Sequence, residues 1–298
     1  MQHKKLYLLM FFAMVAWGET WVSAKILANY LDPMELVFWR FLFSAMGLIP
    51  VIRIMKLGFG ISFKNSLIAL IAGILLIVYN KYFFMGTKFG EAGFGGILVT
   101  TLIPINTFII LALFFGKKTK NKELFALFLG AAGTMTMLEI WRYDIGTLLN
   151  DNTRYFLLAS VIWPLVTIAS SYAKDISAIV MSFYMFLTAA CFDFIFTLNF
   201  NVSDLSAFDG IFWLNILLLS LWGTTFGTSV YFIGTAELGA KTASSYFFLV
   251  PTSAAIFSIV FLHETIQPAT LVGGLMTMIA VYIINGFKVG LKQRYVSR

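Results

Sequence analysis

Long apolar runs are the feature that most limits what this chain can fold into. Runs of about 18–24 residues recur along its 298 residues, and a helix of that length crosses the hydrocarbon core of a membrane. Hydrophobic residues make up 60% of the chain and charged residues only 12%, about half the charged share of an average soluble domain. We therefore predict an all-α integral membrane protein whose main solvent is lipid.

The apolar runs predict ten transmembrane helices. Their expected positions are 6–28, 33–54, 64–87, 91–115, 123–140, 154–173, 177–199, 210–234, 239–262 and 268–287. When both termini are placed in the cytoplasm, most of the 21 Lys and Arg residues fall on cytoplasmic segments. Because basic residues gather on the cytoplasmic side of membrane proteins, we predict a multi-pass protein of the cell (inner or plasma) membrane with cytoplasmic N- and C-termini.

The two halves of the chain repeat short motifs in the same order. The matched pairs are 13–17 with 159–163, 83–87 with 231–235, Pro104 with Pro251, and 129–130 with 272–273. Each half holds five spans, an odd number, so the second copy must insert upside down, as in many secondary transporters. We predict two inverted five-helix repeats at 1–145 and 146–298. Proline kinks a helix, so the matched prolines are candidate hinges.

Several residues of both halves also match a known family pattern. They are Trp17-Gly18, Lys25, Pro33, Arg40-Phe41, Pro104, Gly234, 239–244, Pro251, 262–264 and 271–274. With these residues the chain resembles the drug/metabolite transporter (DMT) superfamily, and within it the EamA family of ten-span exporters. The resemblance implies export of amino acids, metabolites or drugs, and relatives that carry nucleotide sugars leave that cargo as an alternative. One departure is Lys117, which stands where the family usually has a glutamate such as Glu264.

Four ionisable residues fall inside predicted spans: Glu19, Arg40, Lys81 and Asp193. All four come out at similar depth, and their formal charges sum to zero. Because charge inside a membrane is costly and usually functional, we predict that Glu19 pairs with Lys81, or else with Arg40. The alternative is that the pair has no role in transport and only ties the helices together. Asp193 has no partner evident from the sequence.

The resemblance places spans one, three, six and eight around a central cavity. Helical spacing then selects its lining, because Thr224 and Tyr231 share one polar face of span eight. The predicted substrate-binding residues are Trp17, Glu19, Arg40, Lys81, Trp163, Thr224, Tyr231 and Tyr246. Glu19 is in addition the candidate for proton coupling.

Composition narrows the functional classes. One cysteine, Cys191, excludes an internal disulfide, and two separated histidines, His3 and His263, disfavour a metal site. We expect no catalytic residues, metal or cofactor, and no nucleic-acid partner, because no basic soluble segment is present.

The predicted function is secondary active export of small metabolites, most naturally amino acids or related zwitterionic or amphipathic compounds. The expected partners are that cargo, the bilayer and protons, and the expected state is a monomer or weak dimer. An intramembrane enzyme and a passive channel are the alternatives from other classes.

Overall fold

The computed structural model describes residues 2–89, 92–142, 153–198, 201–262 and 268–285, which form helices joined by short connections, with no strand in those ranges. The first half comprises α1 (Gln2–Leu27), α2 (Pro33–Ile54), α3 (Phe63–Phe89), α4 (Ala92–Phe115), α5 (Asn121–Met137) and the short η1 (Ile140–Arg142). The second half comprises α7 (Thr153–Ser171), α8 (Ala178–Phe196), η2 (Leu205–Ala207), α9 (Gly210–Leu217), η3 (Leu218–Thr228), α10 (Ser229–Leu238), α11 (Ala240–Ser245), η4 (Tyr246–Leu249), α12 (Val250–Leu262) and α13 (Pro268–Asn285).

The all-helical prediction is confirmed for the described residues, and 8 helices there are long and apolar enough to cross a membrane. They include the unbroken rod Gly210–Leu238, which joins α9, η3 and α10. The other two predicted spans coincide with α5, of 17 residues, and with the consecutive helices α11, η4 and α12. The count of ten spans and the inverted relation of the halves therefore stay predictions. The predicted boundary between the repeats, at 145/146, lies outside the described residues.

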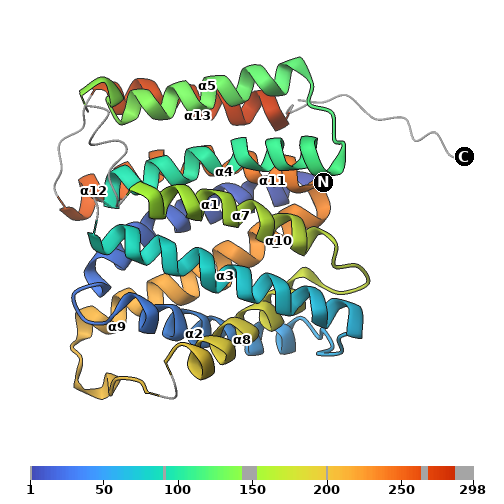
Figure 1. The fold of residues 1–298 in the computed structure, drawn as a ribbon, viewed down its shortest axis with the longest axis vertical. Helices are drawn as coiled ribbons and strands as arrows, with labels where there is room; N and C mark the ends of the chain where they lie inside the picture. The colour runs from blue at the N-terminus through green and yellow to red at the C-terminus, as the bar shows by residue number, and fades with distance from the viewer. Residues whose placement is uncertain (1, 90–91, 143–152, 199–200, 263–267, 286–298) are drawn as a thin grey trace, which may run out of the picture.

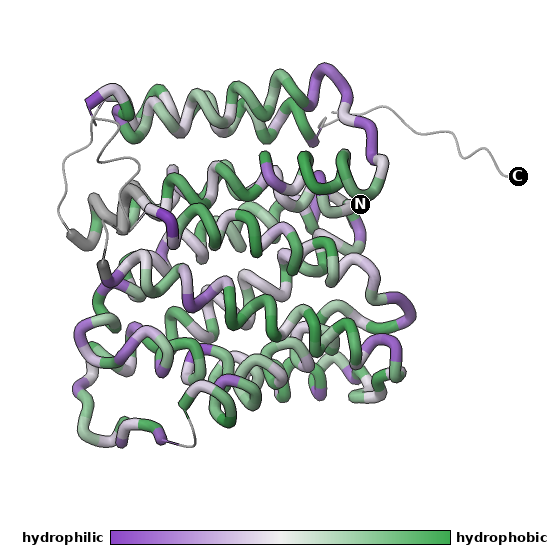
Figure 2. Tube along the Cα trace, in the orientation of Figure 1, coloured by the Kyte–Doolittle hydropathy of each residue, from purple (hydrophilic) through white to green (hydrophobic). Residues whose placement is uncertain are grey.

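The helices run side by side, with apolar residues along their lengths and hydrophilic residues gathered at their ends (Figures 1 and 2). Large apolar side chains point outward from them: Phe114 is 77% exposed and Phe128 73%. Exposed side chains of this kind are suited to lipid rather than to water.

Helices α5 and α13 form a pair at one side of the bundle (Figure 1), and two glycines bring their backbones together. A Cβ atom added at Gly133 would lie 2.7 Å from the carbonyl oxygen of Gly273, and one added at Gly273 would overlap the carbonyl oxygen of Gly133. Glycine is therefore required at both positions for this close approach, which is a common way for helices to pack in membranes.

The matched prolines sit in different local structures. Pro104 lies within the unbroken helix α4, whereas Pro251 is the second residue of α12 and directly follows the 3₁₀ turn η4. Proline at 251 has no N–H to donate to the carbonyl of Phe247, which favours the tighter turn before it. Whether either proline acts as a hinge stays a prediction.

One end of the bundle carries most of the lysines in the described connections. The end of α4, the start of α5 and the start of α11 meet there, at the right of Figure 1. Lys241 Nζ donates to the carbonyl oxygen of Lys118 at 2.9 Å and lies 3.4 Å from Glu123 Oε2. Lys117 and Lys120 lie in the same connection. We call this the basic end; its assignment to the cytoplasm remains a prediction.

Candidate functional site

Four aromatic rings from both halves of the chain meet in the middle of the bundle. Trp17 of α1 has its ring centroid 5.3 Å from Trp163 of α7, 5.1 Å from Tyr231 of α10 and 4.7 Å from Phe247 of η4. Trp17 is held in place by its Nε1, which donates to the carbonyl oxygen of Gly223 at 3.0 Å. We call these four residues the aromatic layer. Trp17 and Trp163, which the sequence matched across the repeats, thus touch in space.

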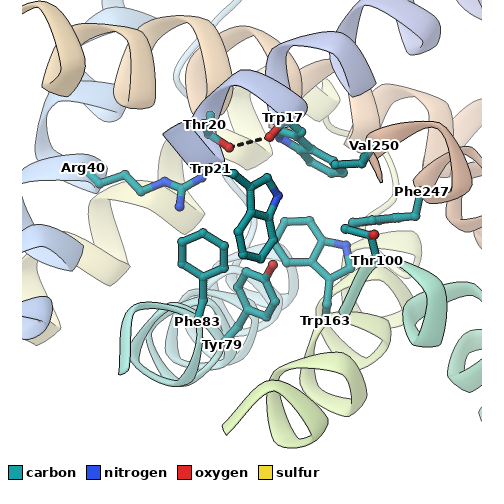
Figure 3. A pocket seen from close by; sticks show the side chains of 10 residues that line it. All are labelled: Trp17, Thr20, Trp21, Arg40, Tyr79, Phe83, Thr100, Trp163, Phe247 and Val250. Carbon is teal, nitrogen blue, oxygen red and sulfur yellow. Dashed lines mark hydrogen bonds between the residues drawn. The ribbon is translucent and has the colours of Figure 1, made fainter. Parts of the chain in front are cut away.

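A small cavity lies beside this layer (Figure 3). Its volume is about 30 Å³, and it is lined by Trp17, Thr20, Trp21, Arg40, Tyr79, Phe83, Thr100, Trp163, Phe247 and Val250. A cavity needs roughly 10–15 Å³ for each water molecule, so this one has room for about two. We call it the central cavity. In this conformation it is too small for a metabolite.

Arg40 is the charged residue among these ten, all of which the structure describes. Its side chain is 7% exposed and is held at two points. Nε donates to Thr224 Oγ1 of η3 at 2.8 Å, and Nη1 donates to Asn80 Oδ1 of α3, also at 2.8 Å. Asn80 in turn donates to the carbonyl oxygen of Leu76 at 2.8 Å. The guanidinium therefore has a fixed orientation, and no ion pair balances its charge within the described part of the chain.

The helix η3, whose Thr224 binds Arg40, has an unusual hydrogen-bond pattern. η3 is a π-helix, in which each backbone bond spans five residues instead of four. Side chains bind its carbonyl oxygens: Thr224 Oγ1 donates to Leu219 at 2.9 Å and Ser44 Oγ of α2 donates to Ser220 at 3.0 Å. Such segments are frequent at functional sites. Sequence reasoning missed this one, since nothing in its residue pattern separates it from an ordinary small-residue helix.

A larger hollow of about 430 Å³ lies toward the basic end. Its lining is Leu111, Phe115, Lys117, Ile168, Ser171, Tyr172, Thr235, Ala236, Leu238, Gly239, Ala240 and Lys241. We call it the basic-end hollow. Between it and the central cavity, the hydroxyl oxygens of Thr167 and Tyr231 lie 2.8 Å apart. Trp163 precedes Thr167 by one turn of α7, and Thr235 follows Tyr231 by one turn of α10, so this hydrogen bond and the aromatic layer separate the two spaces.

The predicted pairing of Glu19 with Lys81 is wrong. Lys81 Nζ lies 3.6 Å from Asp193 Oδ1 of α8 and donates to Thr197 Oγ1 at 2.8 Å. Glu19 instead accepts a hydrogen bond from Ser23, one turn along α1. Nor does Glu19 reach Arg40, whose side-chain hydrogen bonds go to Thr224 and Asn80.

Helix geometry explains why neither Glu19 nor Lys81 is in the lining of the central cavity. Residues two positions apart on an α-helix point about 200° away from each other. Trp17 and Trp21 of α1 line the cavity, so Glu19 between them faces the other way. Lys81 lies in the same way between Tyr79 and Phe83 of α3. Glu19 is nevertheless 7% exposed, and its Oε2 has no hydrogen-bond partner in the described part of the chain.

The other predicted site residues divide into two groups. Trp17, Trp163 and Arg40 line the central cavity. Thr224 and Tyr231 lie behind this lining: Thr224 accepts a hydrogen bond from Arg40, and the ring of Tyr231 packs against Trp17. Tyr246 is buried in η4, and its hydroxyl has no hydrogen-bond partner among the described residues. The lining residues that sequence reasoning missed include Tyr79, Phe83 and Phe247. Tyr79 and Phe83 are spaced i, i+4 in α3, and this aromatic stripe was a usable signal.

Comparisons with known proteins agree on the kind of molecule. The EamA-like transporter family matches residues 4–138 and 154–286. A WAT1-related chloroplastic protein of Arabidopsis thaliana is 24% identical over 288 residues, which cover 90% of this chain and 66% of that protein, so the chain spans just under two thirds of its length. An uncharacterized transporter of Archaeoglobus fulgidus is 22% identical, with 94% and 97% covered, and the uncharacterized transporter YyaM of Bacillus subtilis is 23% identical, with 96% and 95% covered. One solved crystal structure shares the fold, with a TM-score of 0.77 at 16% identity over 97% of this chain and 99% of the other.

Proposed function

We propose that this chain, which belongs to the EamA-like transporter family of the DMT superfamily, is a secondary active exporter that works by alternating access. Its cargo in this proposal is small metabolites, of which amino acids and related zwitterionic or amphipathic compounds are the first candidates. It works in the cell membrane with both termini in the cytoplasm, as a monomer or weak dimer.

One observation carries the proposal: two hollows lie on opposite sides of a single thin barrier. The central cavity and the basic-end hollow are separated by the aromatic layer and by the hydrogen bond between Thr167 and Tyr231. A carrier needs such a barrier, which opens to one side at a time while the substrate site stays in place. A passive channel would need instead a continuous path through the same region.

Each part of the site has a role in this proposal. Trp17, Trp163 and Arg40 contact the cargo when the cavity widens, and Thr224 positions Arg40. Tyr231 closes the route toward the basic end. Lys81 and Asp193 form an ion pair between α3 and α8 and support the bundle away from the cavity.

Glu19 remains our candidate for proton coupling, by a different route from pairing with Lys81. Its buried carboxylate has one oxygen bound by Ser23 and one oxygen without a hydrogen-bond partner among the described residues. A carboxylate in that setting is stabilised when it takes up a proton. Proton uptake and release at Glu19 in α1 then accompany movement of Trp17 on the same helix.

Uptake into inside-out membrane vesicles tests the proposal. Vesicles that contain the protein should take up one or more compounds of an amino-acid and metabolite panel with saturable kinetics, and vesicles without it should not. Flat uptake across the panel would oppose the exporter proposal. Stepwise conductance in a planar bilayer would favour a channel, and chemical turnover by the purified protein would favour an enzyme.

A further inference from the structure

We propose that the central cavity selects cargo with net negative charge: a monocarboxylate with an apolar or aromatic body, whose carboxylate binds Arg40 and Tyr79. The inference rests on the proposed function and, among the cargo classes named there, selects amphipathic organic acids in place of amino acids. Four steps lead to it: the charge of the lining, the free donors, the fixed position of those donors and the character of the remaining walls.

The charge of the cavity is positive and unbalanced. Arg40 carries the charge among the ten lining residues, and none of those ten is acidic. The two intramembrane carboxylates that might balance it are engaged or turned away: Asp193 lies against Lys81, and Glu19 is on the far side of α1 from Trp17 and Trp21. A buried charge without a counter-ion is costly, and an anionic cargo group supplies that counter-ion.

Two donors of the lining are free to bind a carboxylate. Arg40 uses Nε and Nη1 for Thr224 and Asn80, and its Nη2 donates to no described residue. The Tyr79 hydroxyl likewise makes no hydrogen bond to the described residues, and Figure 3 shows it turned toward the centre of the cavity. Guanidinium and phenol groups are strong donors to carboxylate oxygens.

These donors are also fixed in advance. Thr224 Oγ1 and Asn80 Oδ1 hold the guanidinium from two sides, and both partners are anchored in turn to backbone carbonyl oxygens of their own helices. A carboxylate therefore meets a donor that has already lost its freedom of movement, which favours binding.

The rest of the lining suits an apolar body and holds no acidic side chain that could pair with an ammonium group. Trp17, Trp163 and Phe247 present rings, and the Thr20 and Thr100 hydroxyls donate to backbone carbonyl oxygens of their own helices. An amino acid would bring a second positive charge. Ring faces attract such a charge, but the Arg40 guanidinium repels it and no carboxylate in the lining offsets the two. The same lining therefore favours an organic anion over a zwitterion of equal size.

A matched set of four probes tests the inference: 3-phenylpropionate, its amide, phenethylamine and phenylalanine. For each probe we measure the shift that it causes in the thermal midpoint of the detergent-purified protein. We also measure the saturable uptake of the probe itself into inside-out vesicles that contain the protein. We expect 3-phenylpropionate to bind about tenfold or more tightly than the amide, because a hydrogen bond to a charged group is worth about 1.5–3 kcal/mol. Arg40→Gln should abolish this preference, and Tyr79→Phe should weaken it about threefold or more.

Arg53→Gln is the control, since Arg53 lies on α2 near its basic end, exposed and away from the cavity. It should leave the preference unchanged. If Arg40→Gln does not fold, Tyr79→Phe and the four probes decide the question in the native Arg40 protein. Equal binding of the acid and its amide, or tighter binding of the amine or of phenylalanine, would overturn the inference. Saturable uptake of phenethylamine would overturn the inference and leave the proposed transport function standing. An absence of all uptake would contradict the transport function as well.

Discussion

The hydroxyl oxygens of Thr167 and Tyr231 lie 2.8 Å apart, although the two residues are 64 positions apart in the chain. The bond joins α7 to α10 at the level where the aromatic layer ends and the basic-end hollow begins. In the proposed cycle it must break each time the route between the two spaces opens.

Tyr231→Phe removes this hydrogen bond and keeps the ring. The reporter is the thiol of Thr20→Cys, in a protein that also carries Cys191→Ser. We expect this thiol to react faster in the Tyr231→Phe protein than in its parent when an impermeant thiol reagent is added from the basic end. The loss of a hydrogen bond worth about 0.5–1.5 kcal/mol predicts an increase of about two- to tenfold. Tyr246→Phe is the control, because the Tyr246 hydroxyl has no hydrogen-bond partner among the described residues. Equal rates in Tyr231→Phe and its parent would contradict the barrier assignment.

The ion pair of Lys81 and Asp193 predicts an asymmetric response to mutation. Asp193 is fully buried, whereas the Lys81 side chain is 28% exposed. Lys81→Gln strands a buried carboxylate and should lower the free energy of unfolding by about 3 kcal/mol. Asp193→Asn leaves an ammonium that can extend toward the surface, so its cost should be smaller. Thermal midpoints of the two variants and of the double variant measure this, and an equal loss in both single variants would refute it.

Glu19→Gln tests proton coupling. The substitution keeps the shape of the side chain, so we expect the fold to persist while transport loses its dependence on pH. Initial rates of uptake, measured from mildly acidic to mildly basic pH, give the profile. Ser23→Ala is the control, since it removes the hydrogen bond to Glu19 and keeps the carboxylate. A Glu19→Gln protein with the native pH profile would exclude Glu19 from coupling.

The glycine contact between α5 and α13 predicts a sharp local effect. In Gly273→Ala the new methyl group would overlap the Gly133 backbone, so the helices must move apart. We expect a loss of about 1–3 kcal/mol, typical of overpacking. Gly60→Ala is the matched control, because a Cβ there meets nothing within 4 Å. Equal thermal midpoints for the two variants would show that the contact does not stabilise the fold.

A hydrogen bond at the end opposite the basic end predicts a dependence of stability on pH. Asp209 accepts from the backbone N–H of Phe212 and from the Tyr30 hydroxyl, and these bonds lower the pKa of Asp209. A lowered pKa stabilises the folded state at neutral pH, and this contribution disappears as the pH falls through that pKa. Asp209→Asn should therefore have a lower thermal midpoint than the native protein at pH 7, with a gap that narrows below about pH 4. A gap independent of pH would contradict this.

The helical class and most of the element positions could be predicted from apolar runs, because run length reports directly on membrane crossing. Trp17, Trp163 and Arg40, which the sequence named together, line one cavity, and their role in binding cargo stays a prediction. The predicted pairing of Glu19 with Lys81 is wrong because equal depth in the membrane does not place two residues on helix faces that meet. The true partner, Asp193, depends on α8 lying against α3, and no local pattern encodes which helices are neighbours.

Thr224 and Tyr231 lie seven residues apart on one continuous rod, Gly210–Leu238. The first binds the guanidinium that lines the central cavity, and the second binds Thr167 between the cavity and the basic-end hollow. The helix is unbroken from one residue to the other, through the last turn of η3 and into α10. In the proposed cycle, rotation or tilt of this helix would move both residues at once, so that filling of the central cavity and opening of the barrier would be coupled through a single helix.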